Sequence, residues 1–349
     1  MLRCGLISCA DLFPRSRHTD ITFEERATQQ HNSLLTHHSL THSLTIWCMF
    51  KSIYTLTTAL ITFTTTATIT RAMSFGQFAA TSQFYLYGTQ YCTRTGWERA
   101  SRQYPQPDEL DTVDLSNRVF IVTGANSGIG FESSSFLAKK GATVYMVCRN
   151  PERAEIAKNK IVELTKASKN GIETENVFVI LGDCSLQSGI QKIWNDFKAH
   201  RELLGVLQDN LRLDGILCNA GGLNNESIVT TTAEGIETTF AAHLLFGTYH
   251  LVNLALPTLE NTPNSRVIVV SSGGMYNTKF PSWNRATARR GTFDGQFAYA
   301  YAKRGQVLLC EEWTKMYPKV TFASCHPGNK SPIVLSKLNP ANFTFTQVG

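Results

Sequence analysis

The sequence contains no Cys-x-x-C motif, no block of lysine and arginine, and no long run of strongly apolar residues. Its nine cysteines show no metal-ligand spacing, and an odd number does not suit a framework of disulfides. Small buried thiols in a reducing compartment fit better, because four of the cysteines fall at or near the ends of predicted strands. These four are Cys148, Cys184, Cys218 and Cys325. We therefore expect no metal centre.

The absence of a basic block matters because the chain carries a net charge of +6. Dispersed positive charge gives no support to nucleic-acid binding, whereas a modest positive field suits an anionic cofactor. Hydrophobic residues make up 42% of the 349 positions, which is enough for a large core in one or two domains.

Regular periodicity is missing from residues 1–72, where His, Ser and Thr dominate. The stretch 53–70 is mildly apolar, but nine of its 18 residues are threonine, whereas a spanning helix needs about 20 strongly apolar residues. This stretch also begins too far from Met1 to be the core of a cleaved signal. We expect residues 1–72 to be a disordered extension of a cytoplasmic protein. A membrane-associated location stays open, as does a mitochondrial presequence, because Arg, Ser and Thr outweigh acidic residues locally.

Residues 73–116 are rich in aromatic side chains, from Phe75 to Trp97. They predict a helix that packs on the main domain or, as the alternative, makes peripheral membrane contact through residues 73–100. Pro105 and Pro107 then interrupt the pattern and predict a short linker.

Apolar runs alternate with helical patterns from residue 117 to residue 328. This alternation predicts a Rossmann-type α/β fold, a doubly wound parallel sheet of strand order 3-2-1-4-5-6 with helices on both faces. Ligands of such folds bind outside the carboxyl ends of the strands, where the strand order reverses. The expected strands are 119–122, 142–147, 177–181, 213–217, 266–270 and 320–324, and the main expected helices end at 140 or span 152–167, 185–207, 233–256 and 296–316.

A glycine-rich turn follows the first strand and opens the first helix, which is the context that a dinucleotide site requires. Gly124 allows a tight turn, Gly128 lets the backbone approach a pyrophosphate, and Gly130 lets helix and strand pack closely. The N-terminus of the helix offers free N–H groups to the anion. The full motif consists of Thr123, Gly124, Ala125, Asn126, Ser127, Gly128, Ile129 and Gly130.

The end of the second strand favours NADP(H) over NAD(H). An NAD site places a carboxylate near this point for the ribose 2′-OH, but Cys148 stands here and Arg149 follows it. Arg149 can grip a 2′-phosphate, and the hydroxyl of Ser127 can add another donor. A solvated surface arginine is the alternative interpretation.

Two further segments follow strands at the same edge. Asp183, after the third strand, is a candidate acceptor for the adenine amino group, an N-cap of the helix expected near Ser185, or both. Asn219, Ala220 and Gly221 end the fourth strand, where small residues let the cofactor ribose pass close to the backbone. A plain turn is the alternative.

Tyr299 and Lys303 stand four residues apart on a predicted helix and so share one face. A tyrosine pKa near 10 is too high for acid–base catalysis at neutral pH, and lowering it by about three units needs roughly 4 kcal/mol. One ammonium at about 4 Å supplies that much at an effective dielectric of about 20. We therefore expect Lys303 to lower the pKa of Tyr299 and to bond the nicotinamide ribose. Ser271 and Ser272 close the fifth strand, and because their side chains point to opposite faces, one of them is expected to hold a substrate carbonyl against Tyr299.

These motifs together resemble the short-chain dehydrogenase/reductase superfamily. The resemblance runs from residue 117 to residue 328, about 210 of the 349 residues. It implies Ser272 as the residue that orients the carbonyl, Tyr299 as the acid/base, and Lys303 as its partner.

The same resemblance implies that Pro327 and Gly328, after the sixth strand, lie beside the cofactor. In two places the sequence departs from the superfamily's pattern. The superfamily often has an asparagine that anchors a water relay to the lysine, and here His243 stands at the equivalent position; histidine can bind water and shuttle protons. Residues 329–349 carry no pattern for the helix and seventh strand with which the superfamily continues, so we expect an atypical tail.

The sequence therefore predicts an NADP(H)-dependent oxidoreductase that acts on a carbonyl or alcohol of a small molecule. Two alternatives stay open, a nucleotide-binding protein without turnover and a misfolded fragment of an enzyme. The first follows from the lack of a clear counterpart to the superfamily's substrate-covering segment, and the second from the lack of a pattern for the last helix and edge strand, whose loss would expose the core.

Overall fold

A computed structural model describes residues 82, 86–88, 92–104, 109–167, 176–223, 227–289 and 292–328 of the chain. The expected extension at 1–72 and the expected tail at 329–349 lie outside these residues, as does most of the aromatic segment before residue 92.

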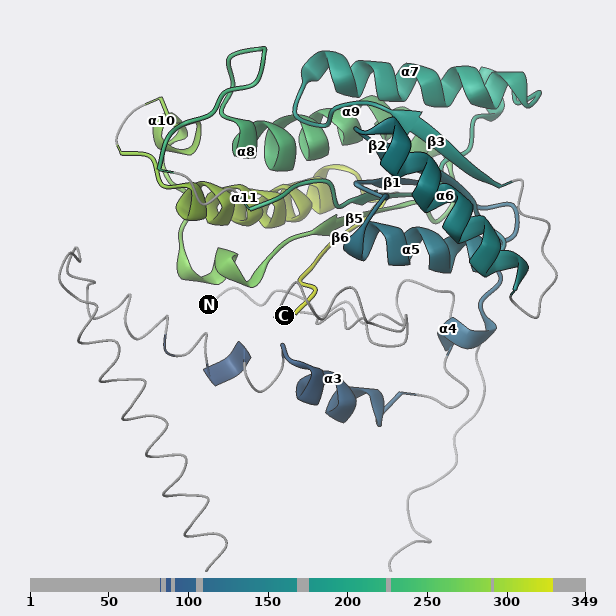
Figure 1. Cartoon of the computed structure of the whole chain (residues 1–349), viewed down its shortest axis with the longest axis horizontal. Coiled ribbons are helices and arrows are strands. Elements are labelled where there is room, and N and C mark those ends of the chain that lie inside the picture. Colours follow the sequence, from purple (N-terminus) through teal and green to yellow (C-terminus); the bar gives the residue numbers. More distant parts are fainter. Residues whose placement is uncertain are drawn as a thin grey trace, which may run out of the picture. The chain divides into compact units, whose positions relative to one another are not determined.

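Six parallel strands form the sheet of the described residues, in the predicted order β3-β2-β1-β4-β5-β6. The strand order reverses between β1 and β4, which lie side by side. Helices cover both faces of this sheet (Figure 1). The strands are β1 (Val119–Thr123), β2 (Thr143–Cys148), β3 (Val177–Leu181), β4 (Gly215–Cys218), β5 (Arg266–Val270) and β6 (Thr321–Cys325).

The longer helices follow the strands in alternation, and shorter ones lie before β1, on either side of β4, and between β5 and α11. The longer ones are α5 (Gly128–Lys139), α6 (Pro151–Lys166), α7 (Gln187–Leu203), the π-helix η3 (Ala241–His250), α9 (Leu251–Asn261) and α11 (Gly295–Met316). The shorter ones are α3 (Arg94–Ser101), α4 (Glu109–Thr112), η2 (Gln208–Asn210), α8 (Thr238–Phe240), η4 (Gly273–Asn277) and α10 (Trp283–Ala286). None of the helices within the described ranges is long and apolar enough to cross a membrane.

The sheet has an apolar core on each face because strand side chains alternate between faces. In β2, Val144 and Met146 belong to the cluster that packs against α5 and α6. Tyr145 and Val147 belong to the opposite cluster, formed with α7, η3, α9 and α11. β2 is therefore apolar at every position of its middle, as expected for a strand covered on both sides.

The helix predicted over 185–207 is shorter at both ends than predicted, since α7 spans Gln187–Leu203. Its start is fixed from outside the segment, because the carboxylate of Glu234 accepts hydrogen bonds from the backbone N–H groups of Gln187 and Ser188 at 2.7 and 3.0 Å. Its end is followed by Gly205, whose φ of +79° stops the helix.

The long helix predicted over 233–256 is three consecutive pieces, α8, η3 and α9. It begins at Thr238 because the carboxylate of Glu237 caps the backbone N–H groups of Thr239 and Phe240, each at 2.7 Å. The prediction that Pro257 ends it was wrong, because α9 continues to Asn261. Proline removes one hydrogen bond from this helix, and the burial of apolar side chains on both sides of it keeps the helix intact.

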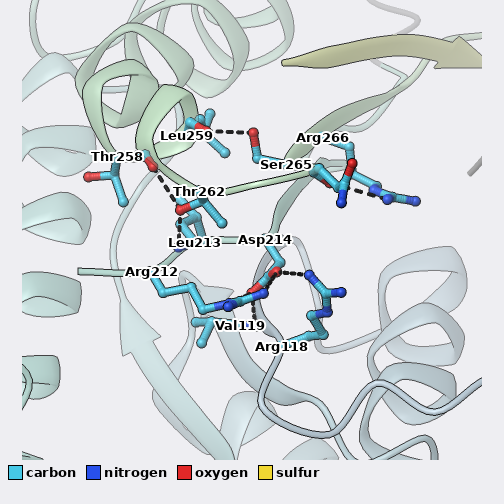
Figure 2. A network of polar contacts seen from close by, with 11 residues as sticks. Arg118, Val119, Arg212, Leu213, Asp214, Thr258, Leu259, Thr262, Ser265 and Arg266 are labelled. Atoms are coloured by element: carbon cyan, nitrogen blue, oxygen red, sulfur yellow. Dashed lines mark hydrogen bonds and ion pairs between the residues drawn. The ribbon is translucent and has the colours of Figure 1, made fainter. Parts of the chain in front are cut away.

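A buried carboxylate joins the amino ends of β1 and β4, at the edge opposite the glycine turn (Figure 2). Asp214 is 3% exposed and accepts hydrogen bonds from the guanidinium groups of Arg118 and Arg212 and from the backbone N–H of Val119. Burial raises the pKa of Asp214, but these hydrogen bonds outweigh it and hold the pKa below its ordinary value. The network fastens the two central strands together.

Candidate active site

The glycine turn adopts the backbone conformations that its sequence predicts. Gly124 and Gly128 have φ values of +64° and +55°, which glycine tolerates best. A Cβ at Gly130 would lie 2.3 Å from the carbonyl oxygen of Gly124, so a side chain there does not fit. A Cβ at Gly128 would meet nothing within 4 Å. The open space at Gly128, beside the exposed Ser127 at the N-terminus of α5, fits a pyrophosphate.

The turn after β4 is hydrogen-bonded to the end of β1. The hydroxyl of Thr123 accepts from the backbone N–H groups of Asn219 and Ala220, both at 2.9 Å. The side-chain amide of Asn219 donates to the carbonyl oxygens of Thr123 and Gly124 at 3.0 and 3.3 Å. Thr123 and Asn219 therefore hold these two turns at a fixed distance, and Asn126 and Ile129 are partly buried in the first of them.

Cys148 takes the position where an NAD site would hold a carboxylate. Burial raises the pKa of its thiol to about 11, and the nearby backbone N–H groups of Ala125 and Asn126 oppose this change only in part. Cys148 thus remains a neutral thiol at the end of β2, and the carbonyl of Val147 joins the glycine turn to β2 by accepting from the backbone N–H of Gly124 at 2.9 Å.

Arg149 follows Cys148 with a side chain that is 80% exposed. Its Nη1 lies 3.7 Å from Oδ2 of Asp183. The other carboxylate oxygen of Asp183 accepts from the backbone N–H and the hydroxyl of Ser185, at 2.8 and 2.7 Å. The prediction of Asp183 as an N-cap was therefore wrong, because its hydrogen bonds close a turn ahead of α7.

Tyr299, Lys303 and Ser272 come together from α11 and the end of β5. The side chain of Ser272 lies near enough to the hydroxyl of Tyr299 to favour the ionised phenol. Nζ of Lys303 lies 5.5 Å from the centroid of the Tyr299 ring. Ser271 is buried and donates to the backbone carbonyl of Lys303 at 3.0 Å. Of the two candidate serines, Ser272 is the one that reaches Tyr299.

The pKa values in this group differ from the sequence expectation. Burial raises the pKa of Tyr299, and the nearby side chain of Ser272 opposes this change. Lys303 is 3% exposed and donates to the carbonyl of Val270 at 2.7 Å, and burial lowers the pKa of its ammonium to about 8. The expectation that Lys303 lowers the pKa of Tyr299 was wrong in this arrangement, because the ammonium bonds a backbone carbonyl and not the phenol oxygen.

His243 lies against the same group from η3. Its ring stands 5.2 Å from that of Tyr299, at 87°. A Cβ at Gly221 would lie 1.9 Å from Cε1 of His243, so the ring rests directly on that glycine. Nε2 lies 2.9 Å from the carbonyl oxygen of Gly222, and because a carbonyl accepts, Nε2 carries the proton. Burial, and then the charge of Lys303, lowers the pKa of His243 to about 3, so the ring is neutral near pH 7.

The turn after β6 is closed by His326, whose Nδ1 accepts from the backbone N–H of Gly328 at 3.0 Å. Gly328 has a φ of +84°, and a Cβ there would lie 2.9 Å from the carbonyl oxygen of Cys92. Pro327 is partly buried in this turn. The segment that precedes α3 therefore packs on the turn that the resemblance assigns to the cofactor.

Two polar residues close to the site escaped the sequence analysis. Gln306 and Thr248 are each 1% exposed, and both form hydrogen bonds near His243. A signal existed for Gln306, because it lies three residues after Lys303 and shares the helix face of Tyr299. Thr248 gave none, since its position depends on the π-helix.

Comparison with known proteins agrees with this geometry. Residues 118–285 match the family model described as short chain dehydrogenase. The chain is 36% identical over 245 residues to Dehydrogenase/reductase SDR family member 12 of Bos taurus, which covers 70% of each protein. The chain belongs to the short-chain dehydrogenase/reductase family.

Other members of this family show how far the similarity extends. Retinol dehydrogenase 11 of Mus musculus is 30% identical over 218 residues, 62% of each chain. The crystal structure of an uncharacterized protein from Mycobacterium paratuberculosis has a TM-score of 0.50 at 22% identity, covering 66% of this chain and 74% of that one, and shows the fold alone. Family membership makes this short-chain dehydrogenase/reductase an NAD(P)-binding oxidoreductase of the hydride-transferring class.

Proposed function

We propose that this protein uses NADP(H) to reduce a carbonyl, or to oxidise an alcohol, of a small molecule, with Tyr299 as the acid/base. The observation that carries the proposal is the meeting of Ser272, Tyr299, Lys303 and His243 from three separate elements. They follow strands that end at the same edge as the glycine turn, where nicotinamide cofactors bind in such sheets.

In this proposal the phenol of Tyr299 gives a proton to the carbonyl oxygen in reduction and takes it back in oxidation. The hydroxyl of Ser272 orients that oxygen, since it lies beside the phenol. Lys303 is buried beside the Tyr299 ring and anchors the ribose of the cofactor. NADPH, when bound, supplies the hydride. The neutral ring of His243 stays beside Tyr299 and carries no charge of its own at neutral pH.

The residues at the end of β2 fit NADP(H). No carboxylate stands where the ribose 2′-OH of NAD would be held, because Cys148 is turned to the glycine backbone. Arg149 is exposed, and its 3.7 Å contact with Asp183 is loose enough for a 2′-phosphate to compete. Asp183 and the pair Ala220 and Gly221 line the proposed adenosine side of the site.

The decisive experiment compares Tyr299→Phe with Tyr301→Phe in the full chain. Tyr301 is a tyrosine two residues along α11 that stacks on Phe297, with 5.9 Å between ring centroids. NADPH consumption is followed with a panel of aldehydes and ketones, and NADPH binding is followed by fluorescence. We expect Tyr299→Phe to lose about 10²- to 10⁴-fold in kcat with NADPH binding intact. Tyr301→Phe should retain parental turnover.

Two results would contradict this function. Turnover at the parental rate in Tyr299→Phe would remove the acid/base role. A parent protein that binds NADPH but turns over no carbonyl or alcohol in the panel would favour a nucleotide-binding protein without catalysis.

We also propose that the enzyme is cytoplasmic and that its aromatic segment packs on its own domain and not on a membrane. Cys92 is 4% exposed, and its carbonyl oxygen lies against Gly328. Both features favour packing of the chain around Cys92 on the domain, whereas Leu86 and Tyr87 are 71% and 40% exposed.

A further inference from the structure

The helix that carries His243 has an unusually wide turn. Residues Ala241–His250 form a π-helix, in which backbone hydrogen bonds span five residues instead of four. A Cβ at Gly247 would lie 1.9 Å from the carbonyl oxygen of Ala242, so the glycine makes room for the turn. Such segments are rare and occur frequently at functional sites.

Side-chain hydrogen bonds converge on the backbone carbonyl of His243. The hydroxyl of Thr248 donates to this oxygen at 2.6 Å, and Nε2 of Gln306 donates to it at 2.6 Å. The second proton of the Gln306 amide goes to the hydroxyl of Thr248 at 2.9 Å. These three residues form a closed ring of hydrogen bonds that is fully buried.

Gln306 connects this ring to the catalytic helix. It follows Tyr299 by seven residues and Lys303 by three, so all three side chains share one face of α11. The distance between the Tyr299 phenol and the His243 backbone is therefore set by one rigid helix and one amide.

We propose that Gln306 and Thr248 are positioning residues for the reaction, because they fix the π-helical turn that holds the His243 ring between Tyr299 and Gly221. The inference rests on the proposed function, since it assigns these residues to the Tyr299 site. The Nε2 proton of His243 is fixed on Gly222, whereas Nδ1 is buried without a hydrogen-bond partner among the described residues. A rotation of the His243 ring would move Nδ1 and would also move the ring edge that contacts Tyr299.

The test uses the full chain with Gln306→Leu and Thr248→Val, which remove the donors at nearly constant volume. Thr248→Ser restores the hydroxyl and serves as the rescue. Thr314→Val is the matched control, because Thr314 is also hydrogen-bonded to a helix carbonyl, that of Cys310, in α11. The chain is labelled with ¹³C-histidine, and the ring signals of His243 are assigned by their loss in His243→Gln.

We expect Gln306→Leu and Thr248→Val to shift the His243 ring signals, since the ring then leaves its perpendicular contact with Tyr299. In the same variants kcat should fall by about ten- to a hundredfold, with the KM for NADPH within about twofold of the parent. Thr248→Ser and Thr314→Val should keep both the signals and kcat. If Gln306→Leu does not fold, Gln306→Asn makes the same test with an amide one methylene short of the carbonyl.

Parental His243 signals and parental kcat in both donor-deletion variants would overturn the proposal. An increase in KM without a fall in kcat would also overturn it, because that result indicates general packing and not positioning. The NMR measurement needs no turnover, so it decides the role of Gln306 even where the Tyr299→Phe comparison contradicts the proposed function.

Discussion

The ammonium of Lys303 donates a hydrogen bond to the backbone carbonyl of Val270 at 2.7 Å, deep in the protein. A cation is thus held mainly by a neutral dipole, and burial brings its pKa from the ordinary 10.5 to about 8. The folded state therefore binds fewer protons at this site than the unfolded state between these two pH values.

This pKa predicts the sign of a stability change. Because the unfolded chain keeps the Lys303 proton up to about pH 10.5, the free energy of unfolding should gain a contribution from this site as pH rises from about 8 to 10.5. Urea midpoints measured across this range should rise less steeply in Lys303→Met than in the parent. The control is Lys279→Met at an exposed position. Equal slopes in parent and Lys303→Met would show that Lys303 does not titrate in this range.

Gly128→Ala should separate cofactor binding from folding. Gly128 and Gly205 both have positive φ, +55° and +79°, and neither would place a Cβ within 4 Å of another group. Each alanine variant should therefore lose about 1–2 kcal/mol of stability through backbone strain alone. Isothermal titration should then find NADPH binding lost in Gly128→Ala and retained in Gly205→Ala. Equal affinity in the two variants would mean that no pyrophosphate approaches Gly128.

Arg149→Ala should weaken NADPH binding by about tenfold or more and leave NADH binding unchanged, because its guanidinium is proposed to bond the 2′-phosphate. Arg153→Ala, at another exposed arginine at the start of α6, is the matched control. Fluorescence titration with both cofactors measures the two affinities. A parental protein that binds NADPH and NADH equally well would refute the preference.

Asp214→Asn should lower the free energy of unfolding by about 2–3 kcal/mol, since two guanidinium groups lose their buried anion. This loss is smaller than for a fully buried ion pair because the side chains of Arg118 and Arg212 are 36% and 39% exposed. The pKa of Asp214 is held below its ordinary 3.8, so the contribution is present above that pH and is lost as pH falls further. Urea denaturation at pH 7 and pH 3 measures both effects. Asp196→Asn, which breaks an exposed ion pair with Lys192, should change stability little at either pH.

The strand order and the glycine turn could be predicted because they depend on local patterns. Val119 to Val122 is a continuous apolar run, and glycines stand where positive φ is needed. The π-helix could not be predicted, because apolar periodicity over 233–256 looks the same with a four- or a five-residue hydrogen-bond span. The start of α7 depends on Glu234, which is far along the chain from Gln187.

In the candidate site, too, some features could be predicted from local sequence patterns and others could not. Tyr299 and Lys303 were recognisable from their spacing on one helix. The strand end left Ser271 and Ser272 both open, and the family resemblance singled out Ser272. The hydrogen-bond partner of Lys303 could not be predicted, because it is the backbone carbonyl of Val270, which no side-chain pattern reveals. The pKa of Tyr299 is raised by burial, which no spacing along the helix reveals, and so its direction was missed as well.

The contact of Cys92 with Gly328 has a consequence for synthesis of the chain. These residues stand at opposite ends of the described sequence, and the carbonyl of Cys92 meets a turn that forms after the last strand. Closing so long a loop is entropically costly and slow. On the ribosome Cys92 emerges well before Gly328, so this contact cannot form until β6 has joined the sheet.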